Sequence, residues 1–373
     1  MIDSSEVQSA TGNAPVQPSR IFPDADKVVG QMRAAFARAA QECASQLKET
    51  TLVLGGQPVR LRTIGPKLHY RIKRPLAHLE TSLPPGEARS TGLTIELWDE
   101  FETGVGCAGF EIEDALDAGK GFIVTASDDS RYVSLRRARL HAVYDRLERR
   151  ITGWSSNGDR LSLAELGRPM QYLFCYWFHD VKLQLIHSGM IGENGAGIIV
   201  AGRSGSGKST TCLVCLEAGM NYLGDDVLVM SGTKATGFIG HSVYNSNHIL
   251  PHDTDRFPHL KRYVNSGGQI KDDKWVVMLH EAFPGQILPN LPIRAIALPR
   301  IVDQPNSAFR RATKAQALMA IAPSSIAFIE GAMSQSVTRL AELVEHVPAY
   351  WVDLGREFRS TPGCIRQLIS QVQ

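Results

Sequence analysis

"GIIVAGRSGSGKSTTCLVCLEAGMNYLGDDVLVM", residues 197–230, decides the fold of this chain. Its centre fits the phosphate-loop pattern G-x-x-x-x-G-K-[ST], and the apolar run Ile198–Ala201 before it predicts a buried strand. We expect a helix from Lys208 to about Ala218, with Gly219 placed to end it in a left-handed conformation. A strand, a glycine loop and a helix in this order predict a phosphate-loop α/β domain.

The glycine loop supplies groups that hold phosphate. Glycines let successive backbone N–H groups turn inward, and the N-terminal end of the following helix adds positive charge. The lysine can reach the outer phosphates, and the hydroxyl of Ser209 can ligate Mg²⁺. We therefore expect ATP and Mg²⁺ as ligands. The residues expected to bind the nucleotide are Gly202, Arg203, Ser204, Gly205, Ser206, Gly207, Lys208, Ser209 and Thr210.

Two adjacent aspartates, Asp225 and Asp226, follow a short apolar approach. In a strand, loop, helix, strand unit they lie beside the phosphate loop. One interpretation is that they only ligate Mg²⁺ or begin the turn before the strand Val227–Met230. The other is that one holds the metal while its neighbour accepts a proton from an incoming hydroxyl.

His187 lies upstream of the loop, in "LQLIHSGMIGENGAG" (183–197). The glycines and asparagine of this stretch predict a hairpin that returns directly into the strand before the loop. That pairing would bring His187 toward the phosphate end of the sheet. Taken alone, a histidine beside apolar residues is more often a core residue.

The spacing of these groups resembles that of a known family. His187 lies 21 residues before Lys208, and Asp225 lies 17 residues after it, as in the kinase domain of bacterial HPr kinase/phosphorylase, a serine protein kinase on a phosphate-loop scaffold. The whole chain is more similar still to the HPr-kinase-like serine kinases found with lasso-peptide biosynthesis genes. The segments that carry this similarity are "LTIELWD" (93–99), "GRSGSGKSTT" (202–211), "YLGDD" (222–226), "KWVVMLHEAFP" (274–284) and "LPIRAIALPRI" (291–301).

The resemblance implies an ATP-dependent kinase whose substrate is a serine hydroxyl on a precursor peptide, including its C-terminal serine. It implies that Asp225 is the base on that serine, that Asp226 assists with Mg²⁺, and that His187 supports the Asp225 carboxylate and the phosphoryl oxygens. The arginine-bearing signature of the HPr-directed enzymes has no match here, where the chain has "GHSVYNSNHILPHD" (240–253) and "NSGGQIKDDKW" (265–275). No expectation of reverse phosphorylase activity, or of HPr as substrate, therefore follows.

Three basic residues, Lys271, Lys274 and Arg300, are candidates for the positive charge that this signature would supply, although such residues are more often solvated surface groups. Two other functions remain open. A small-metabolite kinase would favour a compact pocket near Asp225, lined by Tyr244, Asn245 and Asn247. A non-catalytic protein would bind ATP and only switch conformation.

Composition narrows the class of protein. With 373 residues, 43% of them hydrophobic, the chain can form two or three domains with sizeable cores. A formal charge of +2 indicates neither nucleic acid nor a membrane surface as partner, and the oligomeric state, a homo-oligomer included, stays open. The start of the sequence lacks the apolar stretch of a secretory signal, and the apolar run Tyr172–Phe178 is far shorter than the roughly 20 residues of a membrane span. We expect a cytoplasmic protein.

We expect a flexible tail at 1–25, a smaller α+β domain at 26–155 as a candidate for substrate recognition, and an HPr-kinase-like phosphate-loop domain at 165–373. The fold class is therefore α/β with an α+β domain before it. Cys212 and Cys215 form a C-x-x-C motif, which we interpret as small residues on one helical face rather than as a zinc or redox site.

Two segments before the loop matter for the architecture. The stretch 131–154 suits one face of a helix or, equally, a set of hairpin strands. Its arginines either dock an acidic peptide or form a solvated basic face; they are Arg131, Arg136, Arg137, Arg139, Arg146, Arg149 and Arg150. The aromatic-rich stretch 168–185 predicts a helix that packs under the sheet of the phosphate loop.

Overall fold

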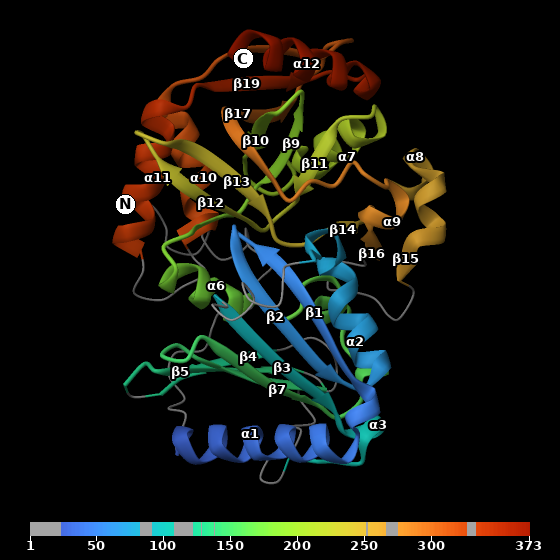
Figure 1. Cartoon of the computed structure of the whole chain (residues 1–373). Coiled ribbons are helices and arrows are strands. Elements are labelled where there is room, and N and C mark those ends of the chain that lie inside the picture. The colour runs from blue at the N-terminus through green and yellow to red at the C-terminus, as the bar shows by residue number, and fades with distance from the viewer. Residues whose placement is uncertain are drawn as a thin grey trace, which may run out of the picture. The chain divides into compact units, whose positions relative to one another are not determined.

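The computed structural model describes residues 24–82, 92–107, 122–127, 129–137, 139–250, 253–265, 275–326 and 333–373. Most of the tail expected at 1–25 lies outside these ranges, as do Lys271 and Lys274. The chain divides into two compact units (Figure 1). The first unit contains residues 24–181 and Tyr244–Ala282, and the second contains Lys182–Val243 and Phe283–Gln373.

These units differ from the domain ranges expected from the sequence. Residues 165–181 and Tyr244–Ala282 were both expected in the second domain but belong to the first unit, as do residues 156–164, which were expected in neither domain. Contacts within the first unit explain the second assignment, because Asn245 donates its backbone N–H to Pro75 O at 2.9 Å and Ser246 donates its hydroxyl to Gly167 O at 2.6 Å.

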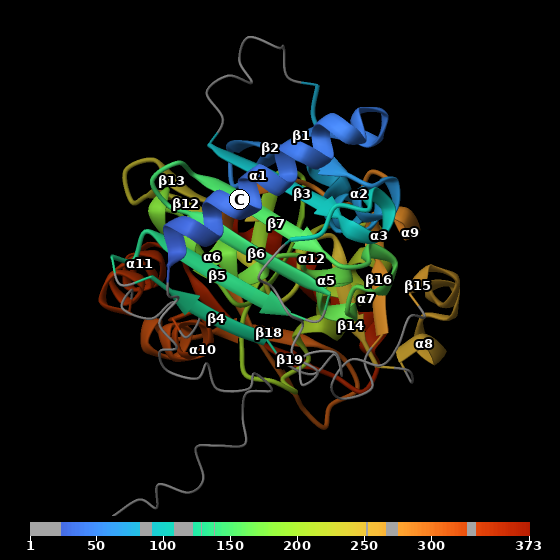
Figure 2. The same cartoon turned by 90° about the horizontal axis from the view of Figure 1, so that it is seen from below.

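The first unit is built on a mixed sheet with the strand order β1-β2-β3-β7-β6-β5-β4. Buried and half-buried residues alternate along its second strand, as the period of two in a strand requires. Helix α1 (Ala25–Glu42) lies across the strands (Figure 2) and buries Met32, Phe36 and Ala39 against them. The strands are β1 (Leu47–Leu54), β2 (Gln57–Ile64), β3 (Leu93–Asp99), β4 (Phe122–Ala126), β5 (Tyr132–Arg137), β6 (Leu140–Asp145) and β7 (Arg150–Ser155).

Shorter elements complete the first unit, including a small sheet in the order β14-β16-β15. They are α2 (Pro66–Lys73), η3 (Arg74–Leu79), α3 (Glu100–Thr103), η5 (Gly158–Arg160), α5 (Leu163–Gly167), α6 (Gln171–Asp180), β14 (Ser246–Ile249), α8 (Asp253–Arg256), η6 (Pro258–Tyr263), β15 (Val264–Asn265), β16 (Trp275–Met278) and α9 (Leu279–Ala282).

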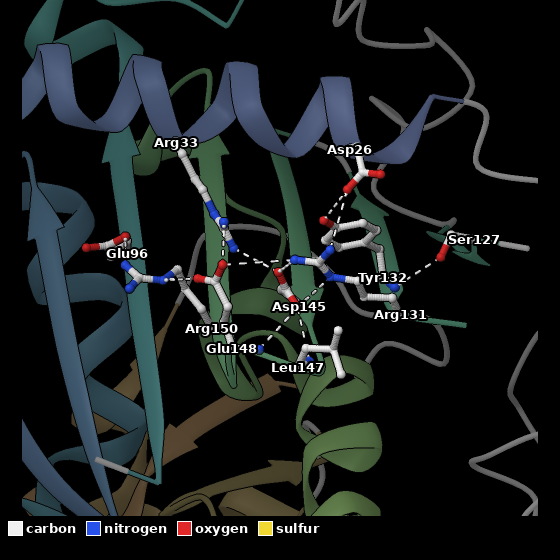
Figure 3. A network of polar contacts seen from close by, with 10 residues as sticks. All are labelled: Asp26, Arg33, Glu96, Ser127, Arg131, Tyr132, Asp145, Leu147, Glu148 and Arg150. Atoms are coloured by element: carbon white, nitrogen blue, oxygen red, sulfur yellow. Dashed lines mark hydrogen bonds and ion pairs between the residues drawn. The ribbon is translucent and has the colours of Figure 1, made fainter. Parts of the chain in front are cut away.

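The arginine-rich stretch 131–154 forms the strands β5, β6 and β7, so of its two interpretations the hairpin is correct. Ion pairs hold several of its arginines in place (Figure 3). Arg131 Nη2 and Arg33 Nη2 each lie 2.9 Å from the same Asp145 oxygen, and Arg150 Nη1 lies 2.7 Å from Glu96 Oε2. The buried Asp145 and Glu96 thus hold Arg131, Arg150 and Arg33 of α1 against the first sheet, so these three guanidinium groups have a structural role.

The aromatic helix α6 packs on the first sheet, whereas the sequence predicted a position under the sheet of the phosphate loop. Polar atoms on this helix fix its place in the first unit. Trp177 Nε1 donates to Gly92 O at 3.1 Å, and the hydroxyl of Tyr144 on β6 donates to Asp180 Oδ2 at 3.0 Å. A hydrophobicity pattern shows that a helix has a buried face but does not identify the sheet that buries it.

Acid should destabilise the fold through His141, whose Nε2 lies 2.8 Å from Ser134 Oγ in the first sheet. Burial, aided by the positive charge of Arg136, lowers the pKa of His141 from 6.5 to about 3. Below pH 6.5 the unfolded chain therefore binds a proton that the folded chain does not. The contribution of the neutral imidazole to the free energy of unfolding is complete above that pH. It is lost as the pH falls toward 3, by up to about 1.4 kcal/mol per pH unit.

Urea unfolding between about pH 7 and pH 5 measures the slope of the free energy of unfolding against pH. We expect His141→Gln to have a shallower slope than the parent chain. The matched control His346→Gln, at the exposed end of α11 (Met333–His346), should keep the parent slope. Equal slopes for the parent and His141→Gln would contradict the prediction.

The second unit is built on a larger sheet in the order β11-β9-β10-β17-β13-β12-β8, with β19 pairing both β17 and β18. The hairpin predicted before the phosphate loop is confirmed, because β9 and β10 are antiparallel neighbours. The strands are β8 (Gln184–Ile186), β9 (Gly189–Glu193), β10 (Ala196–Val200), β11 (Asn221–Gly224), β12 (Leu228–Thr233), β13 (Gly237–Ser242), β17 (Asn290–Ile301), β18 (Ala308–Arg311) and β19 (Ala349–Leu354).

Helices flank this second sheet (Figure 1). Helix α10 (Lys314–Ile326) and α11 share a core cluster with the sheet residues Ile199, Ile296 and Leu298. Helix α12 (Thr361–Val372) is tied to the end of α7 (Lys208–Glu217) by Arg366, whose Nη2 donates to Ala218 O at 2.7 Å. The short helix η8 (Phe358–Ser360) precedes α12. The α/β class predicted for this part of the chain is confirmed by its parallel strands β10, β17 and β19.

Among the residues that the structure describes, no helix is both long and apolar enough to cross a membrane.

Candidate functional site

The strands that carry the predicted site residues end at one edge of the second sheet. Strand β9 is antiparallel to both β10 and β11, and β17 is parallel to β10 and to β19. The strands β10, β11, β17 and β19 therefore run in one direction and finish at the same edge, which we call the carboxyl edge. The phosphate loop leaves β10 at this edge, and the two aspartates leave β11 there.

The phosphate loop, residues 201–207, connects β10 to α7 in a conformation that depends on glycine. Gly205 and Gly207 have φ angles of 76° and 97°, in the left-handed region that side chains disfavour. A Cβ on Gly207 would also lie 2.5 Å from Leu354 Cδ1 at the end of β19. The predicted strand, loop and helix are thus confirmed, and the loop leads directly into the N-terminus of a ten-residue helix.

Lys208 begins α7 and lies within the loop. Its side chain folds back so that Nζ donates to Gly202 O at 2.7 Å and to Arg203 O at 3.2 Å. The residue is only 8% exposed, so the loop itself fixes its position. The backbone N–H groups at the start of α7 and this ammonium group together form a cationic end suited to phosphate oxygens. Toward the tip of the loop, Arg203 and Ser204 are exposed.

Two short connections place His187 beside the aspartates. One links β8 to β9 through His187 and Ser188, and the other links β11 to β12 through Asp225, Asp226 and Val227. Ile186, the last residue of β8, pairs antiparallel with Leu228, the first residue of β12. The first connection therefore starts beside the point where the second connection ends. His187 Nε2 accordingly lies 3.8 Å from Asp226 Oδ1.

Backbone features also support these connections. The N–H of His187 donates to Ser325 Oγ at 2.9 Å, which ties the first connection to α10. Asp226 has a φ of 74°, a left-handed conformation that is uncommon for a residue other than glycine. Strain of this kind persists only where surrounding contacts hold it, and it is often found at functional sites.

Asp225 lies on the inner side of the site and is 7% exposed. A Cβ added to Gly189, at the start of β9, would lie 3.5 Å from Asp225 Oδ1 and 2.5 Å from Cys212 Sγ. The carboxylate and the thiol therefore border the same small space. Burial, reinforced by the negative charge of Asp225, raises the pKa of Cys212 well above its usual value. Cys212 and Cys215 are both buried free thiols, in agreement with the packing role expected for the C-x-x-C motif.

We expect Gly189→Ala to disturb this space. The new methyl group would overlap the Cys212 sulfur, and overpacking of a core typically costs roughly 1–3 kcal/mol. Chemical unfolding measures the loss, and Gly189→Ala/Cys212→Ala should recover part of it because the sulfur is removed. In the matched control, Gly30→Ala on α1, nothing lies within 4 Å of the added atom, so that change should not destabilise the protein. Unchanged stability of Gly189→Ala would contradict the close packing.

The donor set at the carboxyl edge suits Mg²⁺. Ser209, in the first turn of α7, offers a half-buried hydroxyl, and Asp226 offers a carboxylate whose side chain is 28% exposed. Within the described ranges, no group of three or more His, Cys, Asp or Glu side chains is arranged to hold a metal ion. Mg²⁺ at a phosphate site does not require such a group, because it takes further oxygen ligands from phosphates and water.

Other residues considered from the sequence have structural contacts. Arg300, on β17, forms a two-pronged ion pair with Asp353 on β19. Within the first unit, the Tyr244 hydroxyl donates to Pro169 O at 2.8 Å, and Asn245 Nδ2 donates to Arg74 O at 2.9 Å. These contacts give all of these side chains a role in holding their own unit together.

Sequence reasoning missed several neighbours of the site. Ser325 follows His187 by 138 residues, and no local pattern links the two. Gly189 and Cys212 lie within the quoted motifs, but only the packing of β9 against α7 shows that they border Asp225. A glycine two residues after the histidine was the one available signal of a close approach.

No protein-family model matches the chain, and no curated protein matches it. Among solved structures, the chain is similar to the HPr(Ser) kinase/phosphatase from Coxiella burnetii, with 14% sequence identity over 50% of this chain and 95% of that chain, and a TM-score of 0.28.

Proposed function

We propose that the protein is an ATP- and Mg²⁺-dependent serine kinase that acts on a peptide or small protein. The observation that carries the proposal is the carboxyl edge, where a phosphate loop, an aspartate pair and a histidine come together in one unit. A phosphate loop alone supports nucleotide binding. A carboxylate beside it adds a base for an incoming hydroxyl, which a kinase needs and a nucleotide switch does not.

The identity of the acceptor follows from the sequence resemblance. The spacing of His187, Lys208 and Asp225 resembles that of kinases that phosphorylate serine. The chain-wide similarity to kinases of lasso-peptide gene clusters favours a ribosomally made precursor peptide as substrate. We propose the cytoplasm as the location, because ATP and newly made peptides are available there.

Each residue has a separate task in this proposal. Asp225 accepts the proton of the serine hydroxyl while the serine oxygen bonds to the outermost phosphorus and the bond from that phosphorus to ADP breaks. Lys208 and the loop N–H groups hold phosphate oxygens in place. Ser209 and Asp226 would hold Mg²⁺, which neutralises charge on the phosphates.

His187 has a supporting task. The resemblance assigns it to the Asp225 carboxylate, whereas in the structure its Nε2 lies 3.8 Å from Asp226 Oδ1. We propose that it orients the aspartate pair and, when protonated, faces the charge on the transferring group.

The first unit is proposed to take part in peptide recognition. Removing residues 1–150 would not test this, because 156–181 and Tyr244–Ala282 would lose the sheet on which their unit is built. Hydrogen exchange of the full chain with and without substrate peptide is the appropriate measurement. Protection confined to the second unit would exclude this role.

Intact-mass spectrometry tests the proposed function. The protein is incubated with ATP, Mg²⁺ and a pool of serine-containing peptides, and Lys208→Ala serves as the control. A gain of one phosphate group on serine, absent with the variant, is the expected result. ATP consumption without peptide modification would indicate a metabolite kinase, and ATP binding without consumption would indicate a non-catalytic protein.

A further inference from the structure

The direction in which a nucleotide leaves the phosphate loop follows from the strand order. At the carboxyl edge, the Asp225–Asp226 connection lies on the β9 and β11 side of the loop, whereas β17 and then β19 lie on the other side. If Asp225 serves the outermost phosphate, that end of the nucleotide lies toward β11. The nucleoside end then extends toward β17 and β19.

Two connected segments, which together we call the platform, lie on that side of the loop. The segments 302–306, after β17, and 355–360, after β19, are joined by their backbones: Arg356 N donates to Gln304 O at 2.8 Å, and Glu357 N donates to Pro305 O at 3.0 Å. Leu354, the last residue of β19, is the residue that a Cβ on Gly207 would strike, so the platform begins directly beside the phosphate loop.

The platform carries side chains with the chemistry of nucleoside recognition. The Arg356 side chain is 71% exposed and the Asp303 side chain is 87% exposed, with Nη1 and Oδ1 3.3 Å apart. An ion pair this exposed contributes little to stability. A guanidinium plane can stack on a base, and an exposed carboxylate can accept hydrogen bonds from ribose hydroxyls.

We propose that Arg356 and Asp303 form the nucleoside subsite of the ATP site, with Arg356 stacking on the base and Asp303 accepting from the ribose hydroxyls. This inference rests on the proposed function, because it requires a nucleotide on the loop. It adds a division of labour: the loop binds the phosphates, and the platform distinguishes a nucleotide from a bare triphosphate.

Calorimetric titration with two ligands, ATP and inorganic triphosphate, each with Mg²⁺, tests the subsite on the full chain. We expect Arg356→Ala to weaken ATP binding by about tenfold, near the lower end of what stacking on one base contributes, and to leave triphosphate binding unchanged. The matched control Arg310→Ala removes an exposed arginine of β18 and should change neither affinity. Equal weakening of both ligands by Arg356→Ala would show a charge effect and overturn the subsite.

A second variant tests the ribose contact. Asp303→Asn should weaken ATP but not 2′,3′-dideoxy-ATP, which lacks the hydroxyl groups in question. Equal effects on both nucleotides would overturn the role of Asp303.

Titration of the parent chain distinguishes a failure of this inference from a failure of the proposed function. Binding of ATP no tighter than triphosphate would overturn the subsite while leaving the phosphate loop intact. Binding of neither ligand would overturn the proposed function, and the subsite with it.

Discussion

Lys208→Ala should abolish ATP-dependent phosphorylation while the protein remains folded. The lysine is the only cation of the loop motif that the loop itself holds in place, with Nζ hydrogen-bonded to Gly202 O and Arg203 O. Without it, the outer phosphates lose a fixed positive charge, and the loss of one such preorganised group lowers turnover by roughly 10²–10³-fold or more. Single-turnover transfer from ATP measures the effect.

The control for this variant is Lys234→Ala, which removes an exposed lysine from the same unit. It should keep the parent rate, and both variants should retain a cooperative thermal transition. Phosphorylation at the parent rate by a folded Lys208→Ala protein would show that the phosphate loop is wrongly assigned.

Asp225→Asn should separate chemistry from binding. The change is nearly isosteric, so the packing against Gly189 and Cys212 is kept while the ability to accept a proton is lost. Turnover should fall by roughly two to four powers of ten, the usual contribution of a positioned general base. ATP affinity should change little, because the phosphates are held by the loop. Nucleotide titration gives the ATP affinity, and single-turnover kinetics give the rate of phosphate transfer.

Asp226→Asn is the matched comparison. An amide is a poorer ligand for a hard cation than a carboxylate. This variant should therefore require a higher Mg²⁺ concentration and should also transfer phosphate more slowly. The left-handed backbone of Asp226 tolerates asparagine, so the fold should be unaffected. If the two variants show each other's behaviour, the roles of the two aspartates are exchanged.

Much of the second unit could be predicted from local sequence. The phosphate-loop motif fixed the order of strand, loop and helix, and the observed α7 (Lys208–Glu217) ends within one residue of the prediction. The glycines and Asn194 before the loop indicated the β9–β10 hairpin, and that pairing carries His187 to the carboxyl edge. These features depend on residues close together in the chain, where turn chemistry and periodicity act directly.

The unpredicted features depend on distant partners. No local pattern shows that Asp145 and Glu96 would form ion pairs with arginines from three separate parts of the chain. The assignment of α6 to the first sheet depends on its hydrogen bonds to Gly92 and Tyr144, which come from other parts of the chain. The platform that carries Arg356 depends on the parallel pairing of β17 with β19, between which β18, α10 and α11 lie in the sequence.

We propose that the carboxyl edge transfers phosphate from ATP to a serine hydroxyl with Asp225 as the base. Single-turnover transfer from ATP labelled in its outermost phosphate to a pool of serine-containing peptides tests it most directly, with the parent chain and Asp225→Asn compared at saturating ATP and Mg²⁺. We expect label on serine with the parent chain and a rate lower by roughly two to four powers of ten with the variant. Label transfer at similar rates by both proteins, or none by a parent chain that binds ATP, would contradict it.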